Sequence, residues 1–370
     1  MSTRQQRQPI RFDAILLLLT MALLIVGLVM VYSSSYGYAY EGDDSGPGDS
    51  LAFFKRQAMW AGLGVVGLLV AMRLDFRMWG RRPWLYRIGG VTLALLVMMI
   101  FTEGRSIQVG PIGGQPSEFA KMGVIIYMAA WLATPGRDVR NLWLGLVPFL
   151  LLMGVPVVIT LLDPDFSTAL ILGLTLTGMY LVAGAGLREI GIVLSGGFSG
   201  LIAGGLLTED FRMGRLLAWV RGEPGEQLSD VLMAFGRGGM FGVGLGNSTA
   251  KLRVYAAHSD CILAVIGEEF GLIGSLVVMA LYALWIWRGL RIASQCQDRF
   301  GALLAQGFAG WVAFQVIVNV GALTGSLPFT GTVLPFLSGG GSSLMTLLIG
   351  TGLLLSISAH ERPRRVESAR

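Results

Sequence analysis

The sequence predicts an all-α polytopic membrane protein with ten transmembrane helices and a large extracytoplasmic loop between the seventh and the eighth. Over half of the 370 residues are hydrophobic (54%) and only 14% are charged, whereas a soluble domain carries about 25% charged residues. Apolar runs of about 20 residues, the length that crosses a bilayer, recur along the chain. Basic residues lie between these runs. We therefore expect residues 1–370 to form a single integral membrane domain, with residues 208–259 as the loop.

The ten expected spans follow the apolar runs in chain order, and the fourth to the seventh are the shortest. Each run is long enough to cross the hydrocarbon core as a helix. The spans are expected near residues 13–35, 52–72, 84–102, 116–133, 142–161, 166–183, 188–207, 260–287, 301–323 and 334–358.

The distribution of basic residues predicts the orientation, because cytoplasmic loops of membrane proteins are enriched in Lys and Arg. With a cytoplasmic N-terminus, every short inner loop is basic and the C-terminus is cytoplasmic too. The positive charges do not gather on one soluble face, so the net charge of +5 predicts no nucleic-acid partner. The inner loops contain Arg73, Arg77, Arg81, Arg82, Arg87, Arg137, Arg140, Arg188, Arg288, Arg291 and Arg299.

The most informative charges lie between residues 255 and 274. An ionisable side chain within a membrane helix costs about 2.5–3.5 kcal/mol on insertion scales, so it usually has a function. Here a polar approach with His258 and Asp260 leads into an apolar helix that contains Glu268 and Glu269. The orientation places Asp260 at the outer interface, where a base could act on a lipid-borne substrate. The alternatives are Asp260 as the N-cap of the eighth helix and the glutamates as buried hydrogen-bonding groups.

A second polar cluster surrounds the start of the fourth span. Arg105 lies in the preceding loop, and Glu118 and Lys121 follow three residues apart in the motif QPSEFAK. This spacing places the two side chains on one face of a helix. An internal salt bridge would neutralise both charges. In a compatible interpretation, Lys121 faces an anionic headgroup while Glu118 orients it or helps to bind a metal.

Two further clusters contain helix-breaking residues. Asp163 and Asp165 flank a proline, and either they cap the sixth helix or one of them lines an outer cavity. The run from 327 to 344 has two Leu-Pro pairs and three consecutive glycines at the start of the last span. Non-helical backbone at membrane depth survives only when it is buried in protein or lines a wet cavity. The amide and hydroxyl donors of Ser342 and Ser343 would suit phosphate oxygens, and simple loop packing is the alternative.

The loop between the seventh and eighth spans contains a glycine-rich run, GRGGMFGVGLGNS, at residues 236–248. A P-loop would require a Lys-Ser or Lys-Thr pair after the glycines, and none follows. We expect a tight, re-entrant or membrane-hugging loop whose glycines allow backbone segments to pack closely.

Taken together, these motifs resemble the SEDS family of peptidoglycan glycosyltransferases (FtsW, RodA and SpoVE), and most of all its FtsW division branch. Three places depart from the family pattern: Asp163 stands where Gln is frequent, Gly104-Arg105-Ser106 replaces Arg-Arg-Trp, and Gly339 stands where Tyr is common. The matching motifs are QPSEFAK (115–121), DPDFSTA (163–169), GGMFGVGLGNSTAKL (238–252), AHSDCILAVIGEEFGLIG (257–274) and LPFTGTVLPFLSGGGSS (327–343).

The resemblance implies polymerisation of lipid II, in which a sugar hydroxyl displaces polyprenyl pyrophosphate with inversion at the anomeric carbon. Asp260 is then the expected general base. A divalent cation, Mg²⁺ or Mn²⁺, is expected at a site that the sequence does not assign. The expected substrate-binding residues are Arg105, Glu118, Lys121, Asp165, His258, Lys251, Ser342 and Ser343.

The resemblance also implies a location and partners. These are the bacterial cytoplasmic membrane, the growing glycan strand, a cross-linking class B penicillin-binding protein, and other membrane proteins of the division complex. A lipid II flippase and a non-catalytic scaffold of that complex are the alternative functions. A flippase needs a polar path to both membrane faces, yet the inner halves of the expected spans are almost free of charge. This distribution favours an enzyme at the outer surface.

Overall fold

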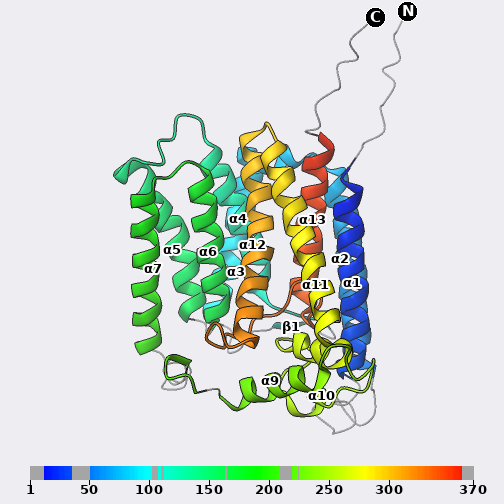
Figure 1. Cartoon of the computed structure of the whole chain (residues 1–370). Coiled ribbons are helices and arrows are strands. Elements are labelled where there is room, and N and C mark those ends of the chain that lie inside the picture. Colours follow the sequence, from blue (N-terminus) through cyan, green and yellow to red (C-terminus); the bar gives the residue numbers. More distant parts are fainter. Residues whose placement is uncertain are drawn as a thin grey trace, which may run out of the picture.

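The computed structural model describes residues 12–35, 51–101, 107–109, 112–162, 165–207, 219–223 and 225–360. These residues fold as a bundle of long helices that run up and down between two ends (Figure 1). The first helix, α1 (Ala14–Ser35), begins at the same end at which the last, α13 (Gly341–His360), finishes. At the opposite end the chain forms short helices and loops.

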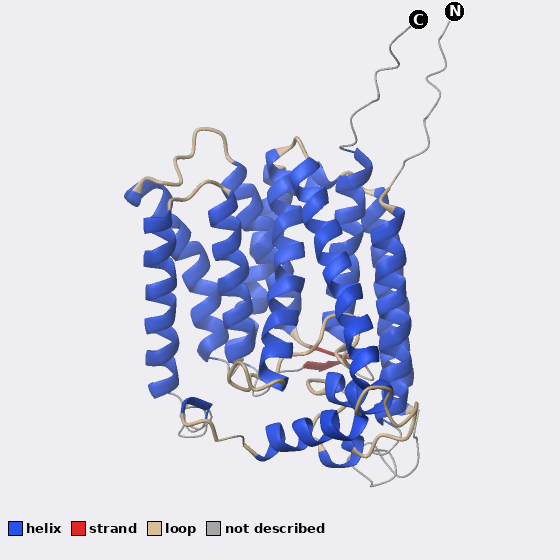
Figure 2. Cartoon of the chain, viewed as in Figure 1, coloured by secondary structure: helices blue, strands red, loops and turns tan. Residues whose placement is uncertain are grey.

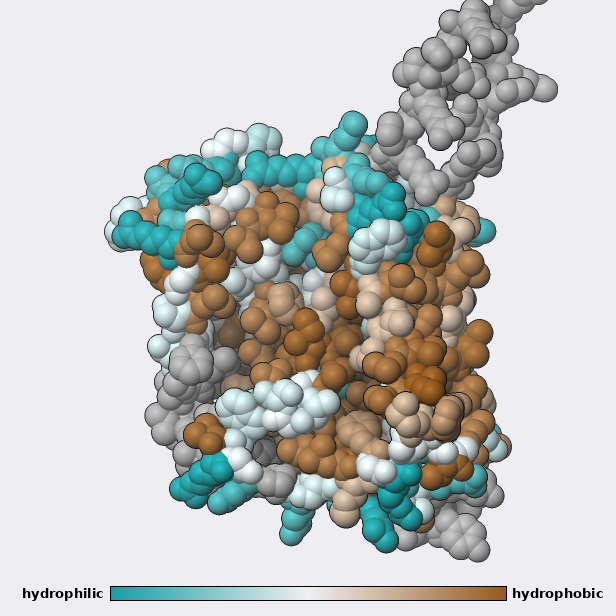
Figure 3. All heavy atoms as spheres, viewed as in Figure 1, coloured by the Kyte–Doolittle hydropathy of each residue, from teal (hydrophilic) through white to brown (hydrophobic). Residues whose placement is uncertain are grey.

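Six of the described helices are long and apolar enough to cross a membrane. The molecular surface agrees with this assignment, because an apolar belt separates two polar ends (Figure 3). A seventh apolar helix, α6 (Phe166–Val182), is shorter. The six are α1, α3 (Arg82–Phe101), the continuous helix of η3 (Leu142–Leu146) and α5 (Val147–Leu162), α11 (Ile262–Gln295), α12 (Arg299–Leu323) and α13.

The remaining helices complete the bundle and its loop-rich end. They are α2 (Ala52–Arg73), η2 (Phe76–Gly80), α4 (Pro116–Ala133), α7 (Leu187–Leu207), α9 (Glu226–Gly238) and α10 (Ala250–Arg253). Most helices coincide with the expected spans to within a few residues. Two boundaries differ: α11 extends to Gln295, and α13 begins only at Gly341, because the preceding Leu-Pro and glycine residues keep residues 334–340 out of the helix, with a turn at 335–337.

One small sheet departs from the all-α expectation. Strands β1 (Ile107–Val109) and β2 (Ile112–Gly114) pair antiparallel, with Ile107 opposite Gly114. The hairpin lies at the loop-rich end of the bundle, just before α4 (Figure 2). Three-residue strands are too short for an apolar alternation that the sequence would reveal.

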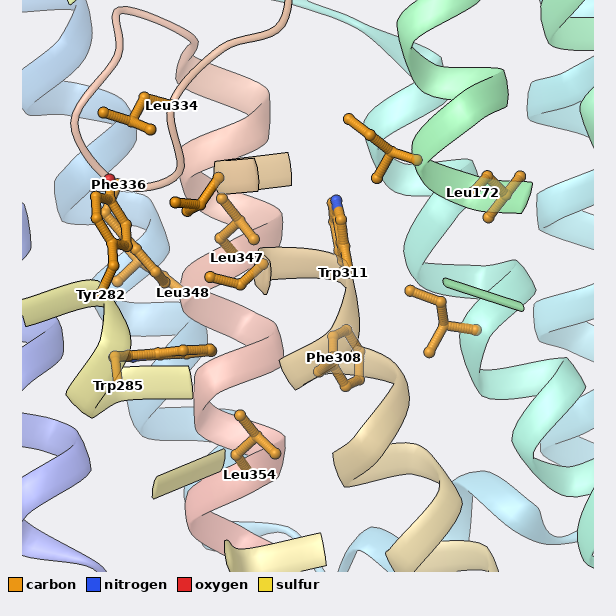
Figure 4. Close-up of a cluster of buried hydrophobic side chains, with 14 of the residues drawn as sticks. Leu172, Tyr282, Trp285, Phe308, Trp311, Leu334, Phe336, Leu347, Leu348 and Leu354 are labelled. Carbon is orange, nitrogen blue, oxygen red and sulfur yellow. The ribbon is translucent and has the colours of Figure 1, made fainter. Parts of the chain in front are cut away.

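The core is centred on α12 and α13. In these two helices 78% and 83% of the apolar window is buried, compared with 17% in α3. Large aromatic side chains fill the space between the central helices: Figure 4 shows Trp285 of α11 and Phe308 of α12 beside α13, and Trp311 of α12 lies near Lys121 of α4. Such side chains bury the most apolar area per residue. The helix α3 instead exposes apolar side chains on the outside of the bundle, as expected of a lipid-facing helix.

Helix α11 is interrupted at Gly271, whose φ of 67° and ψ of −164° are non-helical. The glycine-rich loop packs into this break, and its backbone replaces the helical hydrogen bonds: the amides of Val243 and Gly244 donate to the carbonyls of Glu268 and Glu269 at 2.9 and 3.0 Å. A Cβ on Gly271 would lie 2.5 Å from the amide nitrogen of Gly242. The expectation that the glycines of residues 236–248 allow backbone segments to pack closely is confirmed.

The basic inter-helix segments meet at the end of the bundle where α1 begins. Arg288 at the end of α11 pairs with Asp13 at 2.5 Å, and Arg77 pairs with Asp298 at 3.7 Å. Arg140 donates to the carbonyl of Gly184 at 3.1 Å. The polar motifs of the candidate site all lie at the other end.

Candidate active site

The segment between α12 and α13 forms the floor of the candidate site. Because it is not helical, its carbonyls need other donors, and side chains from two helices supply them. Gln315 of α12 donates to the carbonyl of Val333 at 2.9 Å, and Gln57 of α2 donates to that of Ser338 at 3.0 Å. The hydroxyl of Ser338 donates in turn to the carbonyl of Ser259 at 2.6 Å. The segment is thus fixed to the chain that leads into Asp260.

Asp260 lies on this floor. A Cβ built on Gly331, which has a φ of 65°, would lie 3.1 Å from Oδ2 of Asp260. The amide of Asn319 on α12 donates to the backbone carbonyl of Asp260 at 2.9 Å and also to that of Thr332. The residue that precedes α11 is Cys261, so the alternative of Asp260 as the N-cap of this helix is wrong. Asp260 is partly exposed, and the hydrogen bond from Asn319 fixes its backbone.

His258 is locked into the same floor. Its carbonyl accepts from the amide of Gly339 at 2.8 Å, and its ring lies 4.8 Å from the ring of Phe53. A Cβ on Gly339 would approach that carbonyl to 2.8 Å, so the glycine is required for this contact. Burial lowers the pKa of His258, which keeps the ring neutral at pH 7. A neutral ring offers hydrogen bonding to a substrate but no positive charge.

Asp165 joins three of the sequence motifs. Its side chain caps α6 by accepting from the amide of Thr168 at 3.1 Å, which confirms the capping role. Its second oxygen accepts from the side-chain amide of Gln115 at 2.8 Å. The backbone amide of Gln115 donates to the hydroxyl of Ser342 at 3.0 Å. One carboxylate therefore caps α6 and also connects the start of α6 with the residue before α4.

Ser167, two residues after Asp165, connects this group of Asp165, Gln115 and Ser342 to Asp260. The hydroxyl of Ser167 donates to the carbonyl of Thr330, which directly precedes Gly331 beside Asp260. The motifs that begin at Gln115, at Asp163, at Ala257 and at Leu327 thus meet at one place. Asp163 and Arg105 themselves lie outside the described residues.

Glu118 and Lys121 form the predicted salt bridge, with Nζ and Oε1 2.8 Å apart and both side chains at most 5% exposed. Nζ of Lys121 also lies 5.0 Å from the ring centre of Trp311, a favourable cation–π distance. The other oxygen of Glu118 and the hydroxyls of Ser117 and Ser343 are buried with no hydrogen-bond partner among the described residues. Buried polar atoms of this kind are uncommon and are often found at functional sites.

Lys251 has a different environment. Its ammonium is buried and donates to the carbonyl of Gly246 at 2.5 Å, within the glycine-rich loop. The structure therefore connects Lys251 with that loop and not with Asp165 or Lys121.

Glu268 organises the same loop. Its carboxylate accepts from the hydroxyls of Ser248 and Thr249 at 2.6 and 3.0 Å and from the amides of Thr249 and Ala250 at 3.0 and 2.8 Å. The neighbouring Glu269 accepts from the hydroxyl of Ser33 on α1 at 2.6 Å. Both side chains are 1% exposed. The alternative of buried hydrogen-bonding glutamates is thus confirmed.

Sequence reasoning missed Gln115 and Asn319, whose amides support Asp165 and Asp260. Gln115 stands directly before the conspicuous Pro116, and Asn319 is one of the few amide side chains in an apolar helix, and these were the available signals. Polar side chains inside apolar helices are rarely without a partner.

The family comparison agrees with this arrangement. The sequence model of the family FTSW_RODA_SPOVE, described as cell cycle protein, matches residues 13–363. The chain belongs to this family. Stage V sporulation protein E of Bacillus subtilis is 35% identical over 368 residues, which cover 95% of this chain and 98% of that protein. A probable peptidoglycan glycosyltransferase FtsW of Trichlorobacter lovleyi is 37% identical over 371 residues and 95% of each chain.

Solved structures of the FtsW/RodA/SpoVE family have the same fold. The crystal structure of the rod shape determining protein RodA of Thermus thermophilus aligns with a TM-score of 0.69 at 27% identity, covering 95% of this chain and 98% of that one. A structure of a peptidoglycan synthase complex that coordinates polymerization and crosslinking aligns with a TM-score of 0.74 at 26% identity, covering 94% and 97%. The chain is thus a multi-pass membrane protein with a RodA-like helical fold.

Proposed function

We propose that this protein polymerises peptidoglycan glycan strands from lipid II, as a glycosyltransferase of the FtsW division branch. The observation that carries the proposal is the meeting of four separate motifs around Asp260 at one end of the bundle. Homologues over the full length that are named peptidoglycan glycosyltransferases support it.

Asp260 is the proposed general base. A hydroxyl of lipid II attacks the anomeric carbon of the lipid-linked glycan chain, the bond from that carbon to the pyrophosphate breaks, and Asp260 takes the hydroxyl proton. One displacement inverts the anomeric centre and releases polyprenyl pyrophosphate. A positioned carboxylate contributes about 10²–10⁴-fold to such a proton transfer. Fixing Asp260 through Asn319 keeps the carboxylate oriented before substrate arrives.

The leaving pyrophosphate gains negative charge, and positive groups stabilise it most in the transition state. Lys121 and Arg105 are the proposed cations, and Glu118 orients Lys121 through their ion pair. Asp165, Ser342, Ser343 and His258 would complete the contacts around the substrate. Lys251 is proposed to act through the conformation of the glycine-rich loop, because its ammonium bonds to that loop.

A divalent cation, Mg²⁺ or Mn²⁺, remains part of the proposal. Within the described ranges no three His, Cys, Asp or Glu side chains come together as a metal cluster. Mg²⁺ needs no such cluster, since it is commonly held by one or two carboxylates together with substrate phosphates and water. Glu118, whose second carboxylate oxygen is buried with no hydrogen-bond partner among the described residues, is the residue that fits, and the cation would neutralise charge on the pyrophosphate.

The proposed topology has ten spans in the bacterial cytoplasmic membrane, with both termini in the cytoplasm and residues 208–259 outside. Basic segments gather at the end where α1 begins and α13 finishes, which supports the orientation by the positive-inside rule. The candidate site then faces the outer surface. The proposed partners are a class B penicillin-binding protein that cross-links the product and further membrane proteins of the division complex.

The test is glycan synthesis from labelled lipid II by the purified protein, with and without its cross-linking partner and with Mg²⁺, Mn²⁺ or chelator. We expect polymer from the wild type and almost none from Asp260→Asn. Flipping of lipid II in liposomes without any polymer would indicate the transporter. Division that survives the loss of Asp260 in cells would indicate the scaffold.

A further inference from the structure

A cavity lies at the opposite end of the bundle from Asp260. It has a volume of about 750 Å³ and opens between η2, the start of α3, the end of α4 and the start of α12. Three arginines line it together with aromatic side chains and one carboxylate: Arg77, Arg81, Arg82, Tyr127, Trp131 and Asp298.

The charge of this cavity is positive. Asp298 is the one carboxylate among the described lining residues, and Arg77 lies 3.7 Å from it. Because Asp298 carries a single negative charge and lies beside Arg77, the positive charges of Arg81 and Arg82 are left without a neutralising carboxylate in the part of the lining that the structure describes. Arginine binds phosphate oxygens through strong, charge-assisted and often bidentate hydrogen bonds. The cavity therefore suits a phosphate group.

An apolar groove of about 480 Å³ continues from the cavity along α3, α4 and α5, and the two share Leu85, Tyr86 and Tyr127. On α3 the groove contains two consecutive glycines. A side chain on Gly89 would only just touch the ring of Tyr127, at 3.5 Å, and one on Gly90 would meet nothing within 4 Å. The rest of the lining is almost entirely apolar, so the groove suits a hydrocarbon chain.

We propose that this end binds an anionic glycerophospholipid, with its phosphate at Arg81 and Arg82 and an acyl chain in the groove. A soluble nucleotide or free phosphate would bind to the arginines but would not occupy the apolar groove. A neutral lipid would use the groove without the arginines. Basic pockets joined to apolar grooves between membrane helices suit anionic headgroups. The site lies at the membrane surface remote from Asp260 and is separate from the polymerisation chemistry.

The test uses the full chain in neutral-lipid nanodiscs and a phosphatidylglycerol probe with a photoreactive acyl chain. Peptide mass spectrometry locates the cross-links. We expect them in residues 85–96 and 151–156, competed by unlabelled phosphatidylglycerol and not by phosphatidylcholine. The double variant Arg81→Gln/Arg82→Gln should weaken labelling about 25-fold, because each basic residue near the surface adds about fivefold to anionic lipid affinity. The control Arg188→Gln/Arg291→Gln removes the same charge from exposed positions outside the cavity and should have little effect.

A second pair of variants tests the groove independently of charge. Gly90→Leu fills the groove and should reduce labelling, whereas Gly62→Leu, at an equally open position on α2, should not. Equal labelling by a phosphatidylcholine probe would overturn the proposal. An equal loss of labelling in the Arg81/Arg82 variant and in the Arg188/Arg291 control would overturn it too. Stronger competition by a polyprenyl pyrophosphate than by phosphatidylglycerol would assign the cavity to that lipid and overturn it as well.

Discussion

Asp260 and Glu268 lie eight residues apart in one motif, yet their environments are opposite. Glu268 is 1% exposed and four donors surround its carboxylate. Asp260 is partly exposed and is held through its backbone carbonyl, with its side chain beside Gly331 where four motifs meet. A carboxylate whose acceptor sites are filled by the protein stabilises a loop. Asp260, which is partly exposed where the four motifs meet, is the carboxylate that a substrate can reach.

Replacing Asp260 should give the largest effect on activity and almost none on folding. For Asp260→Asn we expect polymerisation from lipid II to fall about 10²–10⁴-fold, the usual contribution of a general base, with an unchanged melting temperature. Asp230→Asn, on α9 at the same end of the molecule, is the matched control and should polymerise normally. Retained activity in Asp260→Asn would show that Asp260 is not the general base, and its contrast with Glu268 would then have no functional meaning.

Replacing Lys121 should instead damage stability first. In Lys121→Met the buried carboxylate of Glu118 loses its counter-ion, and breaking such a pair typically costs about 3–5 kcal/mol. Glu118→Gln/Lys121→Met leaves no unpaired charge and should recover most of the free energy of unfolding, measured by thermal denaturation in detergent. If Lys121 also binds pyrophosphate, the double variant is folded and inactive. A folded and active double variant would make the pair purely structural.

Glu268→Gln should behave in the opposite way from Asp260→Asn. The new side chain keeps one accepting oxygen, but its NH2 group can only donate, so it cannot accept from all four donors of the loop. Losing hydrogen bonds to a charged group costs about 1.5–3 kcal/mol. We expect a lower melting temperature and faster proteolysis within residues 239–254. Glu226→Gln, on exposed α9, serves as the control. An unchanged melting temperature with lost polymerisation would mean that Glu268 shares in the chemistry.

The smallest effect concerns pH. Burial lowers the pKa of His258, so below about pH 6.5 the unfolded chain binds a proton that the folded chain does not. Stability therefore falls as the pH is lowered from 7 to 5, by at most about 1.4 kcal/mol per pH unit from this group. His258→Asn should flatten the pH dependence of the melting temperature. The chain has two histidines, and His360→Asn should keep the slope; equal slopes in all three proteins would contradict the assignment.

The membrane class, the approximate spans and the acidic and basic positions of the site are readable from the sequence, because each depends on local composition or on spacing within one helix. The salt bridge of Glu118 and Lys121 is such a case, since three residues make just under one helical turn. The cap formed by Asp165 is another. The short β-hairpin could not be predicted in this way, because its strands hold only three residues each and show no pattern.

Only the tertiary structure decided which residues contact one another across long distances in the sequence. Nothing local indicates that Gln115 bridges Asp165 and Ser342, that the glycine-rich loop fills the break at Gly271, or that Asp260 lies against Gly331. These contacts depend on how the helices pack and where non-helical backbone finds donors. The sequence by itself determined which residues carry charge in a membrane; packing decided which of those side chains are buried in hydrogen-bond networks of the protein and which stay partly exposed at the candidate site.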